Sequence, residues 1–268
     1  MAHSWATPLI TLFVSGLVSA LTHSLFPGLL IGHSSLLVLV LCGLGLFVIA
    51  DFSGYLSHLA QHYVPLLWEF HKVHHSAIFL NPLTARRGHP LGVAFDDIVQ
   101  ALIMGAPTGI LVAIFHFNLT ETAFLVLVTN KVFFITSLET LQHSHFPISF
   151  GPLERVFISP HMHQIHHSSC KEHWDKNFGV IFSVWDWLFG TAYKPHAGEF
   201  IVYGVGKAET AEYQDIYGVY VGPFKKIGRL FKYGTSKPPS PTTPTRPLFE
   251  MKGVLWRDPA ASSAAPTD

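Results

Sequence analysis

The chain has 268 residues, of which 49% are hydrophobic and only 13% are charged, and its formal net charge is zero. So low a charged fraction argues against an ordinary soluble enzyme, and the lack of a dense basic stripe argues against a nucleic-acid interface. The two cysteines, Cys42 in an apolar run and Cys170 in a polar segment, are too few and too differently placed for a disulfide framework. The composition therefore indicates a membrane protein.

The N-terminal region contains no Asp, Glu, Lys or Arg before Asp51. Two apolar stretches, 8–31 and 34–50, are separated by a Pro27-Gly28 break, which predicts a hairpin of two membrane-spanning helices. A cleaved signal peptide is the rival interpretation. We disfavour it because the segment lacks a basic start and a second apolar run follows almost at once.

A second hairpin is predicted from the apolar stretches 98–115 and 122–138, which gives about four spans in an all-α integral membrane protein. Beyond residue 235 the chain is rich in Pro, Ser, Thr and Ala, a composition that favours disorder. We therefore expect five parts: a first hairpin (1–50), a first histidine segment (51–97), a second hairpin (98–138), a second histidine region (139–234) and a disordered tail (235–268).

Two hairpins return the chain to the side from which it entered, so both histidine-rich regions should form a helical cap on one face of the membrane. The short loops near 27–33 and 116–121 hold no Lys or Arg, whereas the histidine-bearing segments hold several. The positive-inside rule then places this cap on the cytoplasmic face, of either the endoplasmic reticulum or a bacterial inner membrane.

Histidine is strongly clustered, since eleven of the 18 histidines fall within the windows 58–75 and 143–167. The first window contains 58-HLAQH-62 and 71-HKVHH-75, and the second contains 143-HSH-145 and 161-HMHQIHH-167, so the spacing H-x-x-H-H occurs twice. Residues four apart share a helix face, which predicts that His58 and His62 point to one place. The spacing predicts the same of His71 with His74 and His75.

A lone histidine is most often an ordinary surface side chain, but two arrays in matching register indicate metal binding. A structural zinc ion needs four ligands, and eight or nine histidines exceed that need, so a site for two metals fits better. Imidazole suits Zn, Cu, Fe and Ni, and the ligand type alone does not name the metal. Because metals bind neutral imidazole, occupancy should fall below about pH 6.5, the ordinary histidine pKa.

The chain also resembles a known family in six segments: 51-DFSGYLSHLAQH-62, 68-WEFHKVHHS-76, 87-RGHP-90, 160-PHMHQIHHS-168, 175-DKNFG-179 and 185-WDWLFGT-191. This pattern looks like the fatty acid hydroxylase superfamily, also called the sterol desaturase family. The resemblance implies an integral membrane oxidoreductase with two histidine-ligated iron ions. Such enzymes use O2 and external electrons to hydroxylate or desaturate a lipid, fatty acyl or sterol-like substrate.

Carried over by position, the family's metal ligands correspond to His58, His62, His71, His74, His75, His143, His163, His166 and His167. Some members of the family have a tenth ligand, a histidine, where this chain has Glu139. Glu139, His145 or His161 could take its place or support a ligand, and Gln142 is a weaker candidate. His173 is expected to support a ligand, and His89 to be a loop residue. Glu69 stands where the family often has a basic residue.

No dinucleotide-binding fingerprint or His-Pro-Gly-Gly of a fused cytochrome b5 occurs, so an external donor, cytochrome b5 or a ferredoxin with its reductase, is implied. Two other functional classes stay open. A metal transporter or sensor should place ligands inside the spans, where only His23, His33 and His116 fall in or near apolar runs. A zinc hydrolase needs about three histidine ligands with an acid or base, which leaves most of the motif unexplained.

Overall fold

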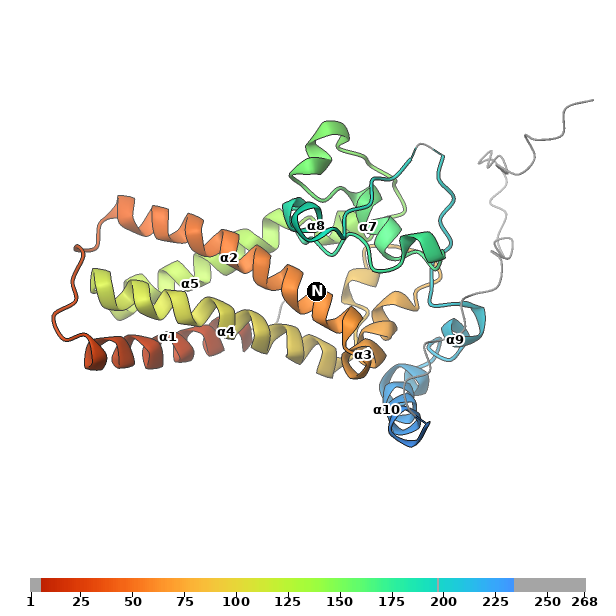
Figure 1. Ribbon diagram of the computed structural model, residues 1–268, viewed down its shortest axis with the longest axis horizontal. Helices are drawn as coiled ribbons and strands as arrows, with labels where there is room; N and C mark the ends of the chain where they lie inside the picture. Colours follow the sequence, from red (N-terminus) through yellow and green to blue (C-terminus); the bar gives the residue numbers. More distant parts are fainter. Residues whose placement is uncertain (1–5, 197, 234–268) are drawn as a thin grey trace, which may run out of the picture.

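The computed structural model describes residues 6–196 and 198–233, and these are helical, with two isolated β-bridges and no strand (Figure 1). Four helices are long and apolar enough to cross a membrane: α1 (Ala6–Leu25), α2 (Leu36–Tyr63), α4 (Pro90–Phe115) and α5 (Leu119–Thr136), the last continuing as a candidate span to Gln142. The prediction of a helical protein with four spans is confirmed. The predicted disordered tail, 235–268, lies outside the described residues.

The four spans form an elongated bundle with the cap at one end (Figure 1). α1 and α4 run away from the cap while α2 and α5 return to it, so both short connections lie at the opposite end. The two-hairpin path is therefore confirmed. The packing is less simple than two tight pairs, however, because α1 packs mainly against α4, and the Ile31 N–H donates to the Ile114 carbonyl at 3.0 Å.

Small residues explain why α1 and α4 approach so closely. α1 buries a stripe of Thr7, Thr11, Ser15 and Ser19. On α4, a Cβ added at Gly109 would lie 2.6 Å from the Ser15 carbonyl oxygen. Gly105, one turn earlier, is equally close to Val14. Small residues commonly mediate the association of membrane helices. Lipid is as apolar as the side chains, so burying apolar surface gives no net driving force and close packing is needed instead.

Several helix boundaries differ from the prediction because polar residues continue the helices beyond the apolar stretches. α2 does not end near residue 50 but runs to Tyr63, and it buries Asp51, Ser53 and Ser57 beyond that point. α4 begins at Pro90, a favourable first helical residue, rather than at 98. α1, in contrast, ends at Leu25 instead of 31. The first histidine pair is thus carried on a direct extension of a span.

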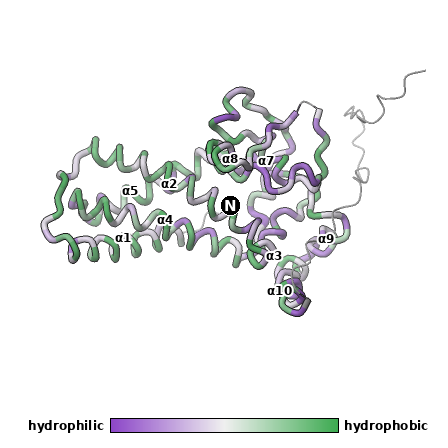
Figure 2. Tube along the Cα trace, in the orientation of Figure 1, coloured by the Kyte–Doolittle hydropathy of each residue, from purple (hydrophilic) through white to green (hydrophobic). Residues whose placement is uncertain are grey.

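The cap consists mainly of short helices joined by irregular segments, and its chain mixes hydrophilic and hydrophobic residues, unlike the largely hydrophobic spans (Figure 2). Its elements are α3 (Pro65–His75), η1 (Thr84–Arg86), α6 (Glu139–Gln142), η2 (Gly151–Arg155), α7 (Pro160–His166), η3 (Lys171–His173), α8 (Val184–Phe189), α9 (Lys207–Ala211) and α10 (Ile216–Tyr233). The division of the chain into five parts stays a prediction.

One buried carboxylate joins the cap to the spans. Asp51 of α2 accepts hydrogen bonds from the Ile181 N–H at 2.8 Å, the Phe182 N–H at 3.3 Å and the Trp185 indole at 2.7 Å. A buried charge is tolerated when several donors satisfy it. Asp51 therefore fixes the second histidine region against the end of α2.

The close α1–α4 contact predicts unequal effects of two matched substitutions. Gly109→Ala should destabilise the protein by about 1–3 kcal/mol, because the added methyl group forces the helices apart. Gly16→Ala is the control, since a Cβ there meets nothing within 4 Å. Thermal unfolding in detergent should show a lower midpoint for Gly109→Ala alone. Equal midpoints for both variants would contradict the close packing.

Candidate metal centre

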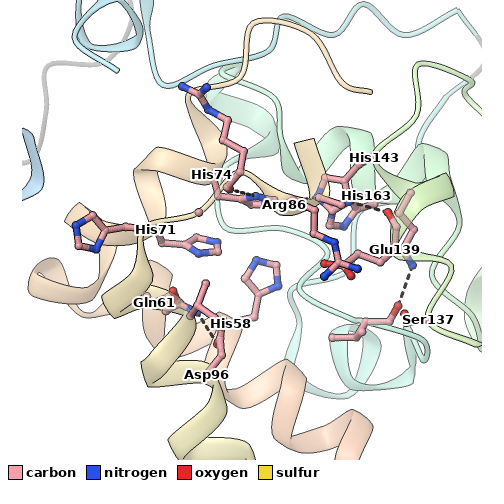
Figure 3. A pocket seen from close by; sticks show the side chains of 18 of the residues that line it. His58, Gln61, His71, His74, Arg86, Asp96, Ser137, Glu139, His143 and His163 are labelled. Atoms are coloured by element: carbon pink, nitrogen blue, oxygen red, sulfur yellow. Dashed lines mark hydrogen bonds between the residues drawn. The ribbon is translucent and has the colours of Figure 1, made fainter. Parts of the chain in front are cut away.

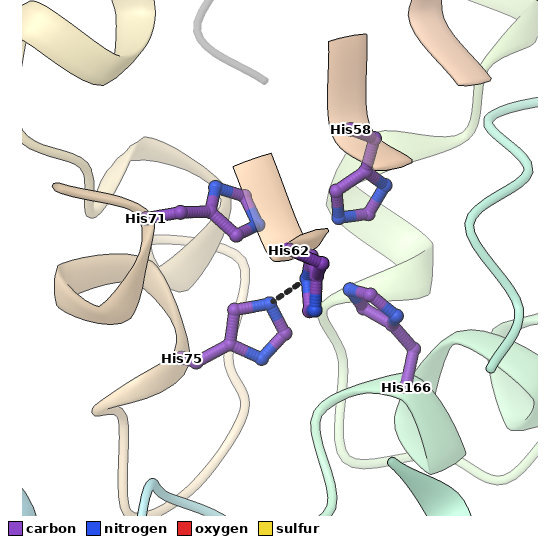
Figure 4. Close-up of side chains that lie close together, drawn as sticks. All are labelled: His58, His62, His71, His75 and His166. Carbon is purple, nitrogen blue, oxygen red and sulfur yellow. Dashed lines mark hydrogen bonds between the residues drawn. The ribbon is translucent and has the colours of Figure 1, made fainter. Parts of the chain in front are cut away.

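All nine histidines predicted as ligands come together, in two adjacent groups. The five-histidine group consists of His58, His62, His71, His75 and His166 (Figure 4). The four-histidine group consists of His74, His143, His163 and His167. Within each group the nitrogen atoms that could bind a metal all lie within 4.8 Å of one another. The geometry is that of two neighbouring metal sites, and the role of each histidine as a ligand stays a prediction.

The two H-x-x-H-H arrays do not each form one group. His71 and His75 belong to the five-histidine group, whereas His74, between them on α3, belongs to the four-histidine group. The second array also divides, with His166 in one group and His167 in the other. The expectation that His71, His74 and His75 share one point is therefore wrong. Adjacent helical residues diverge by about 100°, so each His-His pair spans both groups.

Backbone carbonyl groups hold four of the rings in place, two in each group. In every case the ring Nδ1 lies at hydrogen-bond distance from a carbonyl oxygen, which leaves Nε2 directed into the group. The pairs are His58 with Phe178 (3.1 Å), His166 with Lys176 (2.8 Å), His74 with Arg87 (3.0 Å) and His143 with Glu139 (2.8 Å). Metal-binding histidines are typically oriented in this way.

The ring nitrogen atoms within each group are arranged in a way that suits the binding of a cation. With Nδ1–H donating to a carbonyl, the Nε2 atoms of His74 and His143 both present lone pairs, yet they lie 3.0 Å apart. Facing lone pairs repel each other, and a cation between them removes the conflict. In the five-histidine group, the buried Nε2 atoms of His58, His71 and His166 have no hydrogen-bond partner among the described residues. Both groups are therefore suited to metal ions.

The loop that supports His166 has an unusual backbone. Asp175 and Asn177 both adopt left-handed conformations, with φ of 56° and 57°, on either side of Lys176. The Asn177 amide donates to the carbonyls of Met162 and Tyr193, both at 2.9 Å. These bonds stabilise a conformation that ordinary residues rarely adopt. The result is a fixed Lys176 carbonyl facing the His166 ring.

A second buried carboxylate supports His58. Asp186 of α8 accepts hydrogen bonds at 2.8 Å from the N–H groups of Phe178 and Gly179, and the Thr191 hydroxyl donates to it at 2.7 Å. Burial raises the pKa of Asp186 to about 6. The Phe178 peptide is thereby fixed, and its carbonyl orients His58. Asp51, Asn177 and Asp186 lie in the family motifs, but no local pattern around them indicates these supporting roles.

None of the candidates for the tenth ligand belongs to either group. Glu139 contributes its backbone carbonyl to His143, and its side chain is buried. His145 is exposed and packs on Phe146, and His161 is half-buried. Gln142 donates to the Val180 carbonyl at 2.8 Å. The identity of a tenth ligand therefore stays open among these residues.

The other polar residues noted in the sequence lie outside both groups. His173 contacts the Ser168 hydroxyl and the Glu199 carboxylate, at 2.8 and 2.9 Å. His89 caps α4 by accepting the Leu91 N–H. Glu69 accepts a hydrogen bond from Lys72 at 2.7 Å.

A pocket lies beside both groups and is shown in Figure 3. Five of the histidines line it, together with residues from the start of α4 and the end of α5. Its polar lining includes Gln61, Arg86, Asp96, Ser137 and Glu139, and its apolar lining includes Phe70, Val93, Phe133 and Val180. The pocket therefore connects the histidine groups with the ends of the spans.

Comparison with known proteins identifies the family. The fatty acid hydroxylase family model matches residues 43–191, more than half of the chain, so the chain belongs to that family. Alkylglycerol monooxygenase of Caenorhabditis elegans is 31% identical over 144 residues, which are 53% of this chain and 25% of that protein. Ornithine lipid hydroxylase OlsE of Rhizobium tropici is 31% identical over 151 residues, 55% of this chain and 40% of that protein.

A longer match is to alkylglycerol monooxygenase of Homo sapiens, 25% identical over 208 residues, 72% of this chain and 42% of that protein. The chain thus spans less than half the length of these curated relatives. No solved structure matches it.

The two groups predict which histidines control metal content. His71→Ala and His163→Ala, one from each group, should each lower the metal bound per purified chain, because each removes a nitrogen from a converging set. His145→Ala should retain the full metal content, since His145 is exposed and in neither group. Elemental analysis provides the measurement. Full occupancy in His71→Ala or His163→Ala would refute that assignment.

Burial lowers the pH at which histidines in the two groups of the native protein take up protons, compared with the ordinary histidine value of about 6.5. It lowers the pKa of His143 to about 3 and that of His166 to about 4. The unfolded chain takes up these protons near pH 6.5, whereas the native protein does so only near pH 3–4. The metal-free protein should therefore lose stability as pH falls from about 6.5 towards 4, by up to ~1.4 kcal/mol per pH unit for each such histidine.

Chemical unfolding of the metal-free protein at several pH values tests this dependence. His143→Gln should reduce the slope of stability against pH, whereas His145→Gln should leave it unchanged because His145 is exposed. A slope that is the same in all three proteins would show that burial of His143 does not set the pH dependence.

Proposed function

We propose that this chain is a membrane-bound, non-haem di-iron oxidoreductase that uses O2 to hydroxylate or desaturate a C–H bond of a lipid, fatty acyl or sterol-like substrate. The observation that carries the proposal is the convergence of nine histidines into two adjacent groups beside a pocket at the ends of the spans. Membership of the fatty acid hydroxylase family supports the same chemistry.

Two iron ions bound by these histidines would supply O2 activation, which oxidation of an unactivated C–H bond requires. The chain's own part is to hold and shield the centre. The carbonyls of Phe178, Lys176, Arg87 and Glu139 orient four rings, and the surrounding side chains keep water away from the imidazoles. Imidazole ligands are neutral, so any carboxylate close to the metals would lower the charge of the centre. For this reason Glu139 remains a candidate for the tenth position.

A lipid substrate is supported by where the pocket lies. The pocket is lined by Gly92, Val93 and Asp96 near the start of α4 and by Phe133 near the end of α5. An acyl chain of a lipid in the membrane therefore has a short path to the histidines. The names of the relatives, alkylglycerol monooxygenase and ornithine lipid hydroxylase, are consistent with substrates that combine an apolar chain and a polar group. The polar lining of the pocket suits such a molecule.

The two alternative classes account for less of the structure. A transporter needs ligands along a path through the membrane, but both groups lie together at one end of the bundle. A zinc hydrolase uses about three histidines, and nine converge here.

We further propose that the metal centre faces the cytoplasm, as the distribution of Lys and Arg predicts. Electrons would come from an external donor, either cytochrome b5 or a ferredoxin with its reductase.

Comparative lipidomics tests the reaction and finds the substrate together. Wild-type protein expressed in a host should produce lipids with one added oxygen atom, derived from labelled O2, or lipids that have lost two hydrogens. His166→Ala should abolish the products by removing a ring from the five-histidine group, while His145→Ala should retain them. Purified wild-type protein should contain two irons per chain.

Two results would overturn the proposal. One is a single metal per chain. The other is a protein with two zinc ions that is fully active without O2.

A further inference from the structure

The helix α10 places apolar and basic side chains on separate faces. Tyr217, Tyr220, Phe224 and Phe231 fall on one side of the helix, and their exposed fractions are 58%, 50%, 50% and 84%. We call these four residues the aromatic stripe. Large aromatic side chains this exposed are unusual on a surface that faces only water. Their alignment along one side of a helix points to an apolar environment outside the protein.

A basic stripe borders the aromatic stripe on the same helix. It consists of Lys225, Arg229 and Lys232, all exposed. The Lys225 ammonium group lies 4.6 Å from the centre of the Tyr217 ring, so the two stripes meet. A helix with aromatic residues on one face and Lys and Arg beside them is suited to a membrane surface that carries anionic headgroups.

The position of α10 fits that surface. Figure 1 shows α10 nearly end-on while the four spans run across the view, so α10 lies across the direction of the spans. It packs at the end of the bundle, where Phe224 contacts Phe70 with ring centres 5.5 Å apart. The His89 ring, just before α4, approaches the Tyr220 carbonyl at 3.3 Å. Leu91, the second residue of α4, is itself 48% exposed, so apolar surface continues from the spans towards α10.

Ion pairs fix α10 to the helix that carries His71, His74 and His75. Lys226, on the inner side of α10, lies 3.2 Å from Glu209, and the same carboxylate accepts a hydrogen bond from the buried Lys72 of α3 at 2.8 Å. Lys72 is buried and the Lys226 and Glu209 side chains are partly buried, so the pairs are only partly screened by water. These ion pairs hold the inner side of α10 near α9 and α3. Phe224 of the aromatic stripe lies against Phe70, whereas Tyr217 and Phe231 are largely exposed.

We propose that α10 is an interfacial helix that binds the membrane surface, with its aromatic stripe among the lipid acyl chains and its basic stripe on anionic phospholipid headgroups. The proposal rests on the membrane location of the chain and not on the reaction it catalyses. The proposal also connects α10 with the pocket, because Phe70 and His89, which contact α10, both line the pocket. The docked helix would thus support the pocket wall nearest to the membrane surface.

Nitroxide labels on the full chain test the location of each stripe. In a background with Cys42 and Cys170 replaced by serine, the label is attached at Phe231→Cys, Lys225→Cys or Lys207→Cys, the last an exposed residue of α9. The protein is reconstituted in vesicles of phosphatidylcholine mixed with phosphatidylglycerol. The Phe231 site should collide mainly with lipid-soluble O2, whereas the Lys225 and Lys207 sites should collide mainly with a water-soluble nickel complex.

A charge variant tests the headgroup contribution. Each basic residue near an anionic surface strengthens binding about fivefold, so Lys225→Gln with Arg229→Gln should weaken docking of α10 roughly thirtyfold at low salt. The O2 preference at Phe231 should fall in the mixed vesicles towards its value in pure phosphatidylcholine. The matched control removes two exposed lysines of the cap, Lys194→Gln with Lys207→Gln, and should leave the preference unchanged.

Three outcomes would overturn the proposal. A Phe231 label as accessible to nickel as the Lys207 label would place the aromatic stripe in water. A label shielded from both reagents would mean that protein covers the stripe. An O2 preference unaffected by the charge variant would show that anionic headgroups do not contribute to the docking of α10. Metal content equal to wild type shows that each variant is folded. Because the label pattern does not depend on turnover, loss of the proposed oxidation chemistry would leave it unchanged.

Discussion

Nine imidazole rings in two adjacent buried groups are the constraint around which this protein is arranged. Rings this close cannot all be protonated, and their fixed nitrogen atoms present lone pairs to one another, so the groups suit cations much better than protons. Holding the rings requires anchors that do not themselves move. Backbone carbonyls fill that role, since a peptide group fixed by its neighbours has little freedom to rotate.

Two buried carboxylates, one on each side of the junction between spans and cap, hold the segment that carries one of those anchors, the Phe178 carbonyl. Asp51 on α2 binds the segment at 181–185, and Asp186 on α8 binds the peptides of Phe178 and Gly179. Because α2 also carries His58 and His62, the same helix supplies two of the predicted ligands and fixes the segment that orients one of them. The orientation of His58 therefore depends on a short set of contacts between α2, the 178–185 segment and α8.

The spans are held together by a different kind of interaction. α1 and α4 meet mainly through small side chains and two glycines, and the Thr7 hydroxyl of α1 donates a buried hydrogen bond to Asp97 of α4 at 2.6 Å. Beyond the apolar stretches, α2 and α4 continue into the cap and carry buried polar residues such as Gln61 and Asp96, which bond to each other at 2.7 Å. The change from close packing to polar contacts occurs where the pocket lies.

Local patterns in the sequence were sufficient to predict the helical class, the four spans and the nine clustered histidines, because apolar length and residue spacing are properties of short segments. The boundaries of α2 and α4 were not predictable from hydropathy, since buried polar contacts with the cap extend both helices. The allocation of histidines was also decided by tertiary structure. His74 and His166 each join a group built largely from the other window, because neighbouring residues on a helix point in different directions and only the packing of α3 against α7 shows which ring meets which.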